Sequence, residues 1–196
     1  DEIVSSPNMK EVAYLPPTAP LVGGTGTDMA FQGRYAFVGN YLGFTIYDIK
    51  NPKRTSITSQ VLCPGSQNDV SVTGNLLFLS TDSRRSDDSC ASTAQNDGTQ
   101  PYWEGIKIFD ISDKTNPEVV GTLALPCGSH TATAVPDLEN NRLIVYNPTS
   151  GGPCPFITIF EVPLDDPGSA SIIRQEPLEE ADACHDSAVI TGDVMK

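Results

Sequence analysis

The sequence lacks an apolar run long enough to cross a membrane. Its longest uninterrupted runs, such as Leu76–Leu79 and Leu143–Tyr146, have only four residues, whereas a spanning helix needs about 20. Basic residues are also scarce, because 12 Lys and Arg stand against 25 Asp and Glu, for a net charge of −13. Proteins that bind nucleic acid or anionic membranes present patches of Lys and Arg. The composition therefore argues against both kinds of partner.

Helical periodicity and the common catalytic motifs are missing as well. The sequence has no Gly-x-Ser-x-Gly elbow, no Cys-x-x-Cys and no His-Glu-x-x-His. The glycine-rich stretch Gly23–Thr27 is not followed by Gly-Lys-Ser/Thr, so it predicts a turn and not a phosphate loop. What the sequence does have is 16 Gly and 16 Pro scattered between short apolar runs. That pattern is typical of many short strands joined by turns.

A segment of seven residues recurs three times. Gly43–Ile49, Gly105–Ile111 and Phe156–Val162 share an alternation of residue types that ends in an acidic residue followed by an aliphatic one. Each copy is followed by an Asn-Pro or Asp-Pro turn, and each is preceded by a short run that is apolar on both faces. Such runs suit strands that are covered on both sides. Each repeat unit therefore predicts four short strands.

The size of the unit predicts a β-propeller. The distance from Asp28 to Asp69 is 41 residues, which is the length of one four-stranded blade. We predict an all-β fold, a β-propeller of four-stranded antiparallel blades with about three complete blades. The predicted divisions are 10–20 (outer strand of the closing blade), 27–63, 68–127 with an insertion at 82–101, 129–184, and 185–196 (start of the next blade).

Three complete blades and two partial ones do not close a ring of four to eight blades. An open arc leaves long unpaired strand edges, which folded proteins avoid. We therefore expect the sequence to be the N-terminal part of a larger propeller. The alternative is an assembly in which another chain covers the open edge.

The repeat resembles the LVIVD repeat of secreted and surface β-propellers of bacteria and archaea. The resemblance rests on Tyr/Phe-Asp-Ile followed by an Asn-Pro turn and by Glu-Val-Val-Gly at Glu118–Gly121, and it covers roughly residues 10 to 190. It implies an extracytoplasmic β-propeller. It implies no particular reaction, because one fold hosts many activities.

The five cysteines fit two disulfides. Cys63 and Cys127 each precede the first strand of a blade, whereas Cys90 and Cys154 lie between second and third strands. In a four-stranded blade these loops emerge at one end, which we call the top face. The sequence therefore predicts the pairs Cys63–Cys90 and Cys127–Cys154, each 27 residues apart, in an oxidising compartment. Cys184 is left over, and either pairs outside this sequence or is a reactive or metal-binding thiol.

The only two histidines fall at the same phase of the repeat. Each directly precedes the first strand of a unit, the strand expected to line the central channel, and acidic residues open the first strands of other units. Imidazole and carboxylate together suit Zn, Mn, Fe or Cu, and carboxylates alone suit Ca. A divalent metal site at the channel mouth is thus expected from Asp28, Asp69, His130, His185 and Asp186. The alternative is structural, with acidic residues capping turns and histidines bonding carbonyl groups.

Other acidic residues are predicted to be structural. Asp82, Asp87 and Asp88 lie in the insertion beside two arginines, and their spacing matches no EF-hand loop. They therefore indicate a solvated loop and not a calcium site. The acidic residues that end the repeated strands, Asp48, Asp110 and Glu161, precede turns and are predicted to be turn carboxylates.

Two functions remain open at this stage. The first is an extracellular or cell-surface module that binds a protein or glycan, with or without a metal ion, and Tyr102 and Trp103 either contact a ligand such as a sugar or pack between blades. The second is a metal-dependent enzyme, a lactonase-type hydrolase or an oxidoreductase, with Asp69 or Asp186 as ligand or general base. The loops tied by the predicted disulfides and the missing catalytic motifs favour the binding module. The equivalent positions of the two histidines in the repeat favour the enzyme.

Overall fold

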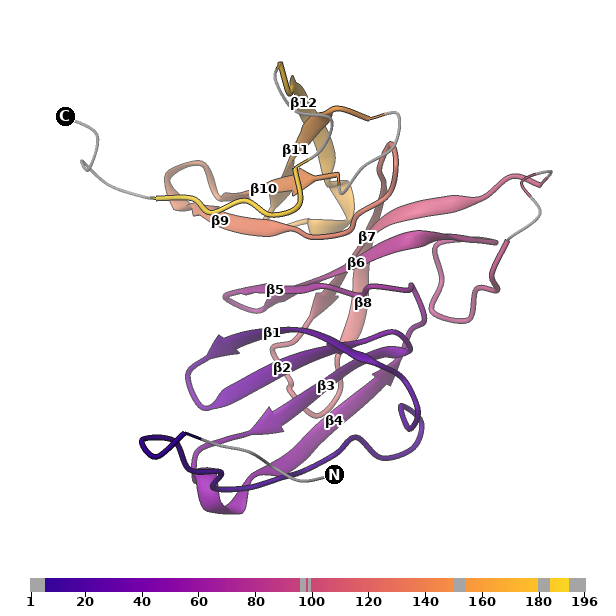
Figure 1. Ribbon diagram of the computed structural model, residues 1–196. Helices are drawn as coiled ribbons and strands as arrows, with labels where there is room; N and C mark the ends of the chain where they lie inside the picture. Colours follow the sequence, from indigo (N-terminus) through magenta and orange to yellow (C-terminus); the bar gives the residue numbers. More distant parts are fainter. Residues whose placement is uncertain (1–5, 96–97, 99, 150–153, 180–183, 191–196) are drawn as a thin grey trace.

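The computed structural model describes residues 6–95, 98, 100–149, 154–179 and 184–190. Within them the chain forms three sheets, each of four consecutive antiparallel strands (Figure 1). The first sheet contains β1 (Gly26–Gln32), β2 (Tyr35–Asn40), β3 (Gly43–Asp48) and β4 (Ser56–Leu62). The second contains β5 (Val70–Thr73), β6 (Leu76–Arg85), β7 (Trp103–Asp110) and β8 (Glu118–Ala124). The third contains β9 (Thr133–Asp137), β10 (Arg142–Pro148), β11 (Phe156–Pro163) and β12 (Ser171–Pro177).

The sheets are the blades of a β-propeller that does not close into a ring, which confirms the predicted fold class. β1 lies beside β5, and β5 lies beside β9, so the first strands of the blades are neighbours. Side chains tie these strands together: Gln32 Nε2 donates to the carbonyl of Gly74 at 2.8 Å, and Ser71 Oγ accepts the N–H of Ala134 at 3.2 Å. No helix among the described residues is long and apolar enough to span a bilayer.

The hydrophobic core lies between the blades. Phe37, Leu77 and Phe109 belong to a fully buried cluster between the first and second blades. Phe78 and Phe160 belong to a second cluster, between the second and third blades. Each such side chain contributes roughly 1.5–3 kcal/mol by its burial. The alternating apolar residues of the repeat thus face the neighbouring blade, which is why every blade stabilises the next.

The three blades share an irregularity that confirms the repeat in three dimensions. The pairing of the third strand with the fourth shifts by one residue at equivalent places, between Ile46 and Tyr47, Ile108 and Phe109, and Ile159 and Phe160. The extra residue lies on the outer strand, and a bulge of this kind increases the twist of the strand. The third copy of the repeat therefore has the geometry of the first two.

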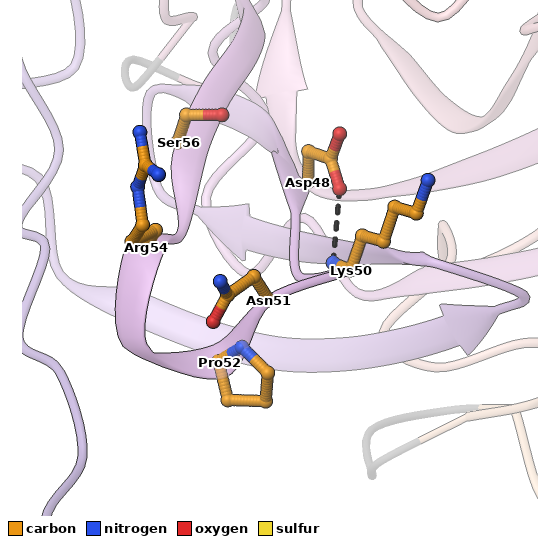
Figure 2. Close-up of a pocket in the computed structure, with 6 residues that line it drawn as sticks. All are labelled: Asp48, Lys50, Asn51, Pro52, Arg54 and Ser56. Atoms are coloured by element: carbon orange, nitrogen blue, oxygen red, sulfur yellow. Dashed lines mark hydrogen bonds between the residues drawn. The ribbon is translucent and has the colours of Figure 1, made fainter.

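The turn after β3 shows why an acidic residue ends the repeated strand. Asp48 Oδ1 accepts the N–H of Lys50 at 2.9 Å (Figure 2). Asn51 Oδ1 accepts the N–H of Lys53 at 3.1 Å. Pro52 begins the one-turn 3-10 helix η1 (Pro52–Arg54). The equivalent carboxylate in the second blade, on Asp110, accepts a backbone N–H two residues on at 2.6 Å. The carboxylates of Asp48 and Asp110 thus bond turn N–H groups, as predicted. Glu161 differs, because it lies within β11 and its carboxylate accepts a hydrogen bond from Arg142 at 2.6 Å.

The structure differs from the predicted divisions in two places. β6 continues to Arg85, where it still pairs with Trp103, so the strand extends into the predicted insertion, and the β6–β7 hairpin projects beyond the neighbouring strands (Figure 1). Residues 10–20, expected as an outer strand, contain no strand. They are almost entirely exposed, and Thr18 accepts a hydrogen bond from Gln60 Nε2 at 3.1 Å. The blade that this outer strand is expected to complete begins at residue 185, and the described residues form no sheet there for it to join. Residues 191–196 of the predicted next blade lie outside the described residues.

A candidate metal centre at the channel mouth

The segment Cys184–Ile190 lies along the third blade beside β9, where it is drawn in yellow (Figure 1). Thr131 Oγ1 donates to the carbonyl of His185, and Thr133 Oγ1 donates to the carbonyl of Ser187 at 2.8 Å. The equivalent side chains of the preceding blade, Asp69 and Ser71, also bond to the backbone of the next unit, but they accept the N–H groups of Ala132 and Ala134. The segment thus occupies the position of a further inner strand. His185 and His130 therefore lie at equivalent positions of neighbouring units, each just before the inner segment.

The imidazole rings of His130 and His185 meet edge to face between the loop before β9 and the Cys184–Ile190 segment. The Nε2 atoms of His130 and His185 lie 3.1 Å apart, and the ring planes are inclined at 77°. His130 Nδ1 lies 2.6 Å from Asp82 Oδ2. His185 Nδ1 lies 2.7 Å from Asp186 Oδ2. Both rings therefore have a carboxylate on one nitrogen and the other histidine on the second.

These contacts favour one tautomer of each imidazole ring. A carboxylate accepts hydrogen bonds, so each Nδ1 carries the hydrogen that it donates to its aspartate. In a neutral imidazole the other nitrogen, Nε2, then holds a lone pair. Two lone pairs 3.1 Å apart repel each other unless a positive species lies between them. The pair accordingly requires either one shared proton or a metal ion.

The His130 side of the pair is rigidly held. Asp82 Oδ1 accepts the N–H of Gln67 at 3.1 Å, which fixes the carboxylate that holds the His130 ring. The backbone N–H of Ser129 donates to the carbonyl of Thr81 at 3.1 Å, and its hydroxyl bonds the Ser80 hydroxyl at 2.8 Å. These contacts orient the ring before any ligand arrives.

Asp82 is the site residue that sequence reasoning missed, since the sequence predicts it as part of a solvated loop. It directly follows the buried run of β6, whose end lies on the top face, where the first strands begin. That position in the repeat is the signal that indicates its place beside His130. Asp87 and Asp88 remain loop residues, and the carboxylate of Asp88 accepts a hydrogen bond from Thr122 Oγ1 at 2.7 Å.

The structure places the expected acidic residues in two groups. Asp186 holds His185, whereas Asp69 lies against Asp28. Asp69 is 9% exposed, and its Oδ2 accepts the N–H of Ala132 at 3.1 Å. Burial first, and then the neighbouring charge of Asp28, raise the pKa of Asp69 to about 7. The Asp28–Asp69 pair therefore retains a proton close to neutral pH.

Among the described residues, no group of three or more His, Cys, Asp or Glu side chains is arranged to hold a metal ion. The predicted five-residue set is thus not assembled as a single ligand shell. What the structure brings together is a two-histidine donor set with a carboxylate behind each ring. Further coordination positions would belong to water or to a bound ligand.

The cysteines form the predicted pairs, Cys63–Cys90 and Cys127–Cys154. Both disulfides close loops on the top face. Cys184 is a free thiol of intermediate exposure, and its Sγ lies 3.3 Å from the carbonyl oxygen of Asp186.

The two aromatic residues of the insertion have different environments. Tyr102 is 49% exposed, and the Arg84 guanidinium lies 4.6 Å from its ring centroid. Trp103 is half-buried and covers the ammonium of Lys107 at 4.3 Å. Lys107 is fully buried and donates to Thr81 Oγ1 at 3.2 Å, and burial lowers its pKa to about 8. Trp103 therefore packs on a buried cation, whereas Tyr102 is accessible to a ligand.

The architecture defines the class of protein as a β-propeller. Two segments, residues 23–61 and 102–124, match the family model of the LVIVD repeat, which confirms the resemblance seen in the sequence. LVIVD repeats form β-propellers, so the family match and the observed blades agree.

Other comparisons add little. No curated protein matches this sequence. One matching solved structure is the complex of S. cerevisiae Dbp5 with Nup159, Gle1, IP6 and ADP, at 12% identity and a TM-score of 0.27. The match covers 75% of this chain and 46% of that chain, so this chain spans less than half of the matched structure. A likeness at this TM-score supports no conclusion about function.

Proposed function

We propose that this β-propeller binds a divalent transition-metal ion at its channel mouth through Nε2 of His130 and His185. The observation that carries the proposal is the convergence of the two Nε2 atoms at 3.1 Å while each Nδ1 is held by a carboxylate. Two nitrogens bound to one tetrahedral zinc ion at about 2.0–2.1 Å lie about 3.3 Å apart. Metal-binding histidines usually donate their second N–H to a carboxylate or carbonyl group, which fixes the ring for coordination.

The donor set favours a particular class of metal. Neutral imidazole suits Zn, Cu, Fe and Ni, whereas Ca takes six to eight oxygen ligands. Two protein ligands leave coordination positions open, and open positions are what a catalytic metal needs. The enzyme alternative, a lactonase-type hydrolase or an oxidoreductase, is compatible with such a site. It would require a substrate that enters the channel mouth beside Asp69.

We place the protein outside the cytoplasm. Disulfides persist in oxidising compartments and are rare in cytosolic proteins. Two disulfides that tie top-face loops, Cys63–Cys90 and Cys127–Cys154, support this assignment, as does the LVIVD match.

The metal proposal is tested by retention of metal after dialysis. Native protein is stripped with EDTA, dialysed against equimolar ZnCl₂, CuCl₂, MnCl₂ and CaCl₂, and analysed for its elements. We expect about one equivalent of a transition metal per chain and no retained calcium, because the facing nitrogens prefer borderline metals. A folded protein that retains no transition metal would contradict the proposal.

A second candidate function is recognition of a glycan or protein by the top face. It is favoured by Tyr102, whose half-exposed ring lies against Arg84 on the insertion that Cys63–Cys90 ties down. Aromatic rings that present an apolar face are enriched at binding surfaces. In a glycan array run in EDTA, we expect any bound glycan to be lost with Tyr102→Ala and kept with Tyr41→Ala, another exposed tyrosine. Equal binding by both variants would exclude the insertion as the contact surface.

A further inference from the structure

We infer that metal binding fastens the Cys184–Ile190 segment to the third blade, so that the histidine pair links two neighbouring units of the propeller. The inference rests on the proposed metal site and adds its conformational consequence. Without metal, only a fraction of the molecules have the segment docked on the third blade. With metal bound to both histidines, the docked form predominates.

The segment has few attachments of its own. Its residues form no strand ladder with β9. Besides the histidine pair, four hydrogen bonds join it to the described parts of other elements. Cys184 N–H donates to the Thr149 carbonyl at 3.2 Å, the hydroxyls of Thr131 and Thr133 donate to carbonyls of the segment, and Ser187 Oγ donates to Thr133 Oγ1 at 3.3 Å. Ile190, at its end, is 75% exposed. Such a segment belongs to the low-stability parts of a fold, which open locally.

The two histidines come from opposite sides of this junction. His130 belongs to the loop before β9, which Ser129 and Asp82 anchor to the second blade. His185 belongs to the weakly attached segment, and its side chain is 60% exposed. The movable partner is therefore His185. When the segment leaves, the two Nε2 donors separate and a metal ion loses one of its two protein ligands.

Linkage then makes the coupling reciprocal. A ligand that binds only the docked form shifts the population towards that form. Any change that lowers the docked fraction of the free protein must weaken apparent metal affinity by the same factor. This should hold even for residues that never touch the metal.

The first test measures amide hydrogen exchange of the full chain with and without ZnCl₂, alongside zinc binding by calorimetry in the same samples. We expect zinc to slow exchange at least ten-fold at the Cys184 amide, whose N–H donates to the Thr149 carbonyl in the docked form, and to leave β2 and β6 unchanged. Zinc that binds without slowing exchange of this segment overturns the inference and leaves the proposed metal site standing. Absence of zinc binding overturns both.

The second test uses a variant that loosens the segment and leaves the ligands in place. Thr133→Val keeps the shape of the side chain but removes the hydroxyl that donates to the Ser187 carbonyl and accepts from the Ser187 hydroxyl. We expect zinc affinity to fall at least about five-fold, because the loss of a single hydrogen bond already corresponds to about that factor. The matched control is Thr73→Val, because Thr73 Oγ1 bonds the Ala134 carbonyl at 3.4 Å one blade earlier. An unchanged affinity in Thr133→Val, or an equal loss in Thr73→Val, contradicts the inference.

Discussion

Replacing His185 by alanine is expected to weaken zinc binding at least about 100-fold while the fold remains intact. The substitution removes one of the two protein ligands, and loss of a group behind a ligand already costs about 10–100-fold. The side chain is 60% exposed, so its removal opens no cavity in the core. Zinc titration by calorimetry measures the affinity, and thermal unfolding in EDTA checks that the variant is as stable as the native chain.

Two further variants separate the ligands from their supports. His130→Ala should match His185→Ala. Asp82→Asn should cost less, about 10–100-fold, because an amide holds the His130 ring without the charge of a carboxylate. Asp110→Asn is the control, since the Asp110 carboxylate caps a turn in the same sheet. If His185→Ala binds zinc as tightly as the native chain, the metal lies elsewhere, and the Cys184 thiol is the next residue to test.

Much of the fold can be predicted from the sequence because the information is local and repeated. The alternation in Gly43–Ile49 and Gly105–Ile111 places apolar residues on the faces between blades, and the structure buries Ile46 and Ile108 there. The two disulfides follow from the same reasoning, because loops at one end of a blade are near each other. The conformation of residues 10–20 is not predictable in this way, since the strand expected there needs the sheet of a further blade, and the described residues form only three sheets.

The candidate site, too, is predictable from the sequence only in part. The equivalent positions of His130 and His185 in the repeat are sufficient to predict that they lie near each other, because equivalent positions of adjacent blades are neighbours. They do not predict which other side chains contact the two rings. Asp82 reaches His130 from a stretch where the β6–β7 register shifts between Thr81 and Arg85. Its position in the repeat therefore indicates the top face but not the contact with the His130 ring. Likewise, the burial of Asp69 depends on packing between blades and not on its position in the repeat.

The Asp28–Asp69 pair leads to the second large effect, a loss of stability as the pH rises. The folded-state pKa of Asp69, about 7, lies above the ordinary value of 3.8, so between these values the folded state binds a proton that the unfolded state has released. Stability therefore falls as the pH rises through this window. Three pKa units correspond to about 4 kcal/mol, which is the upper limit for the contribution of this group.

Asp69→Asn is expected to remove this pH dependence. An asparagine at residue 69 still offers an oxygen to the N–H of Ala132, and its amide is neutral next to Asp28. The variant should match the native chain near pH 4 and exceed its free energy of unfolding by about 2–4 kcal/mol at pH 8. Urea unfolding in EDTA at pH 4, 5, 6, 7 and 8, with disulfides intact, measures the difference, and subtraction of the two chains cancels the titration of the histidines. A constant difference at every pH would mean that Asp69 ionises like an ordinary surface carboxylate. The channel mouth would then carry an additional full negative charge at neutral pH, which by itself would attract cations to the facing histidines.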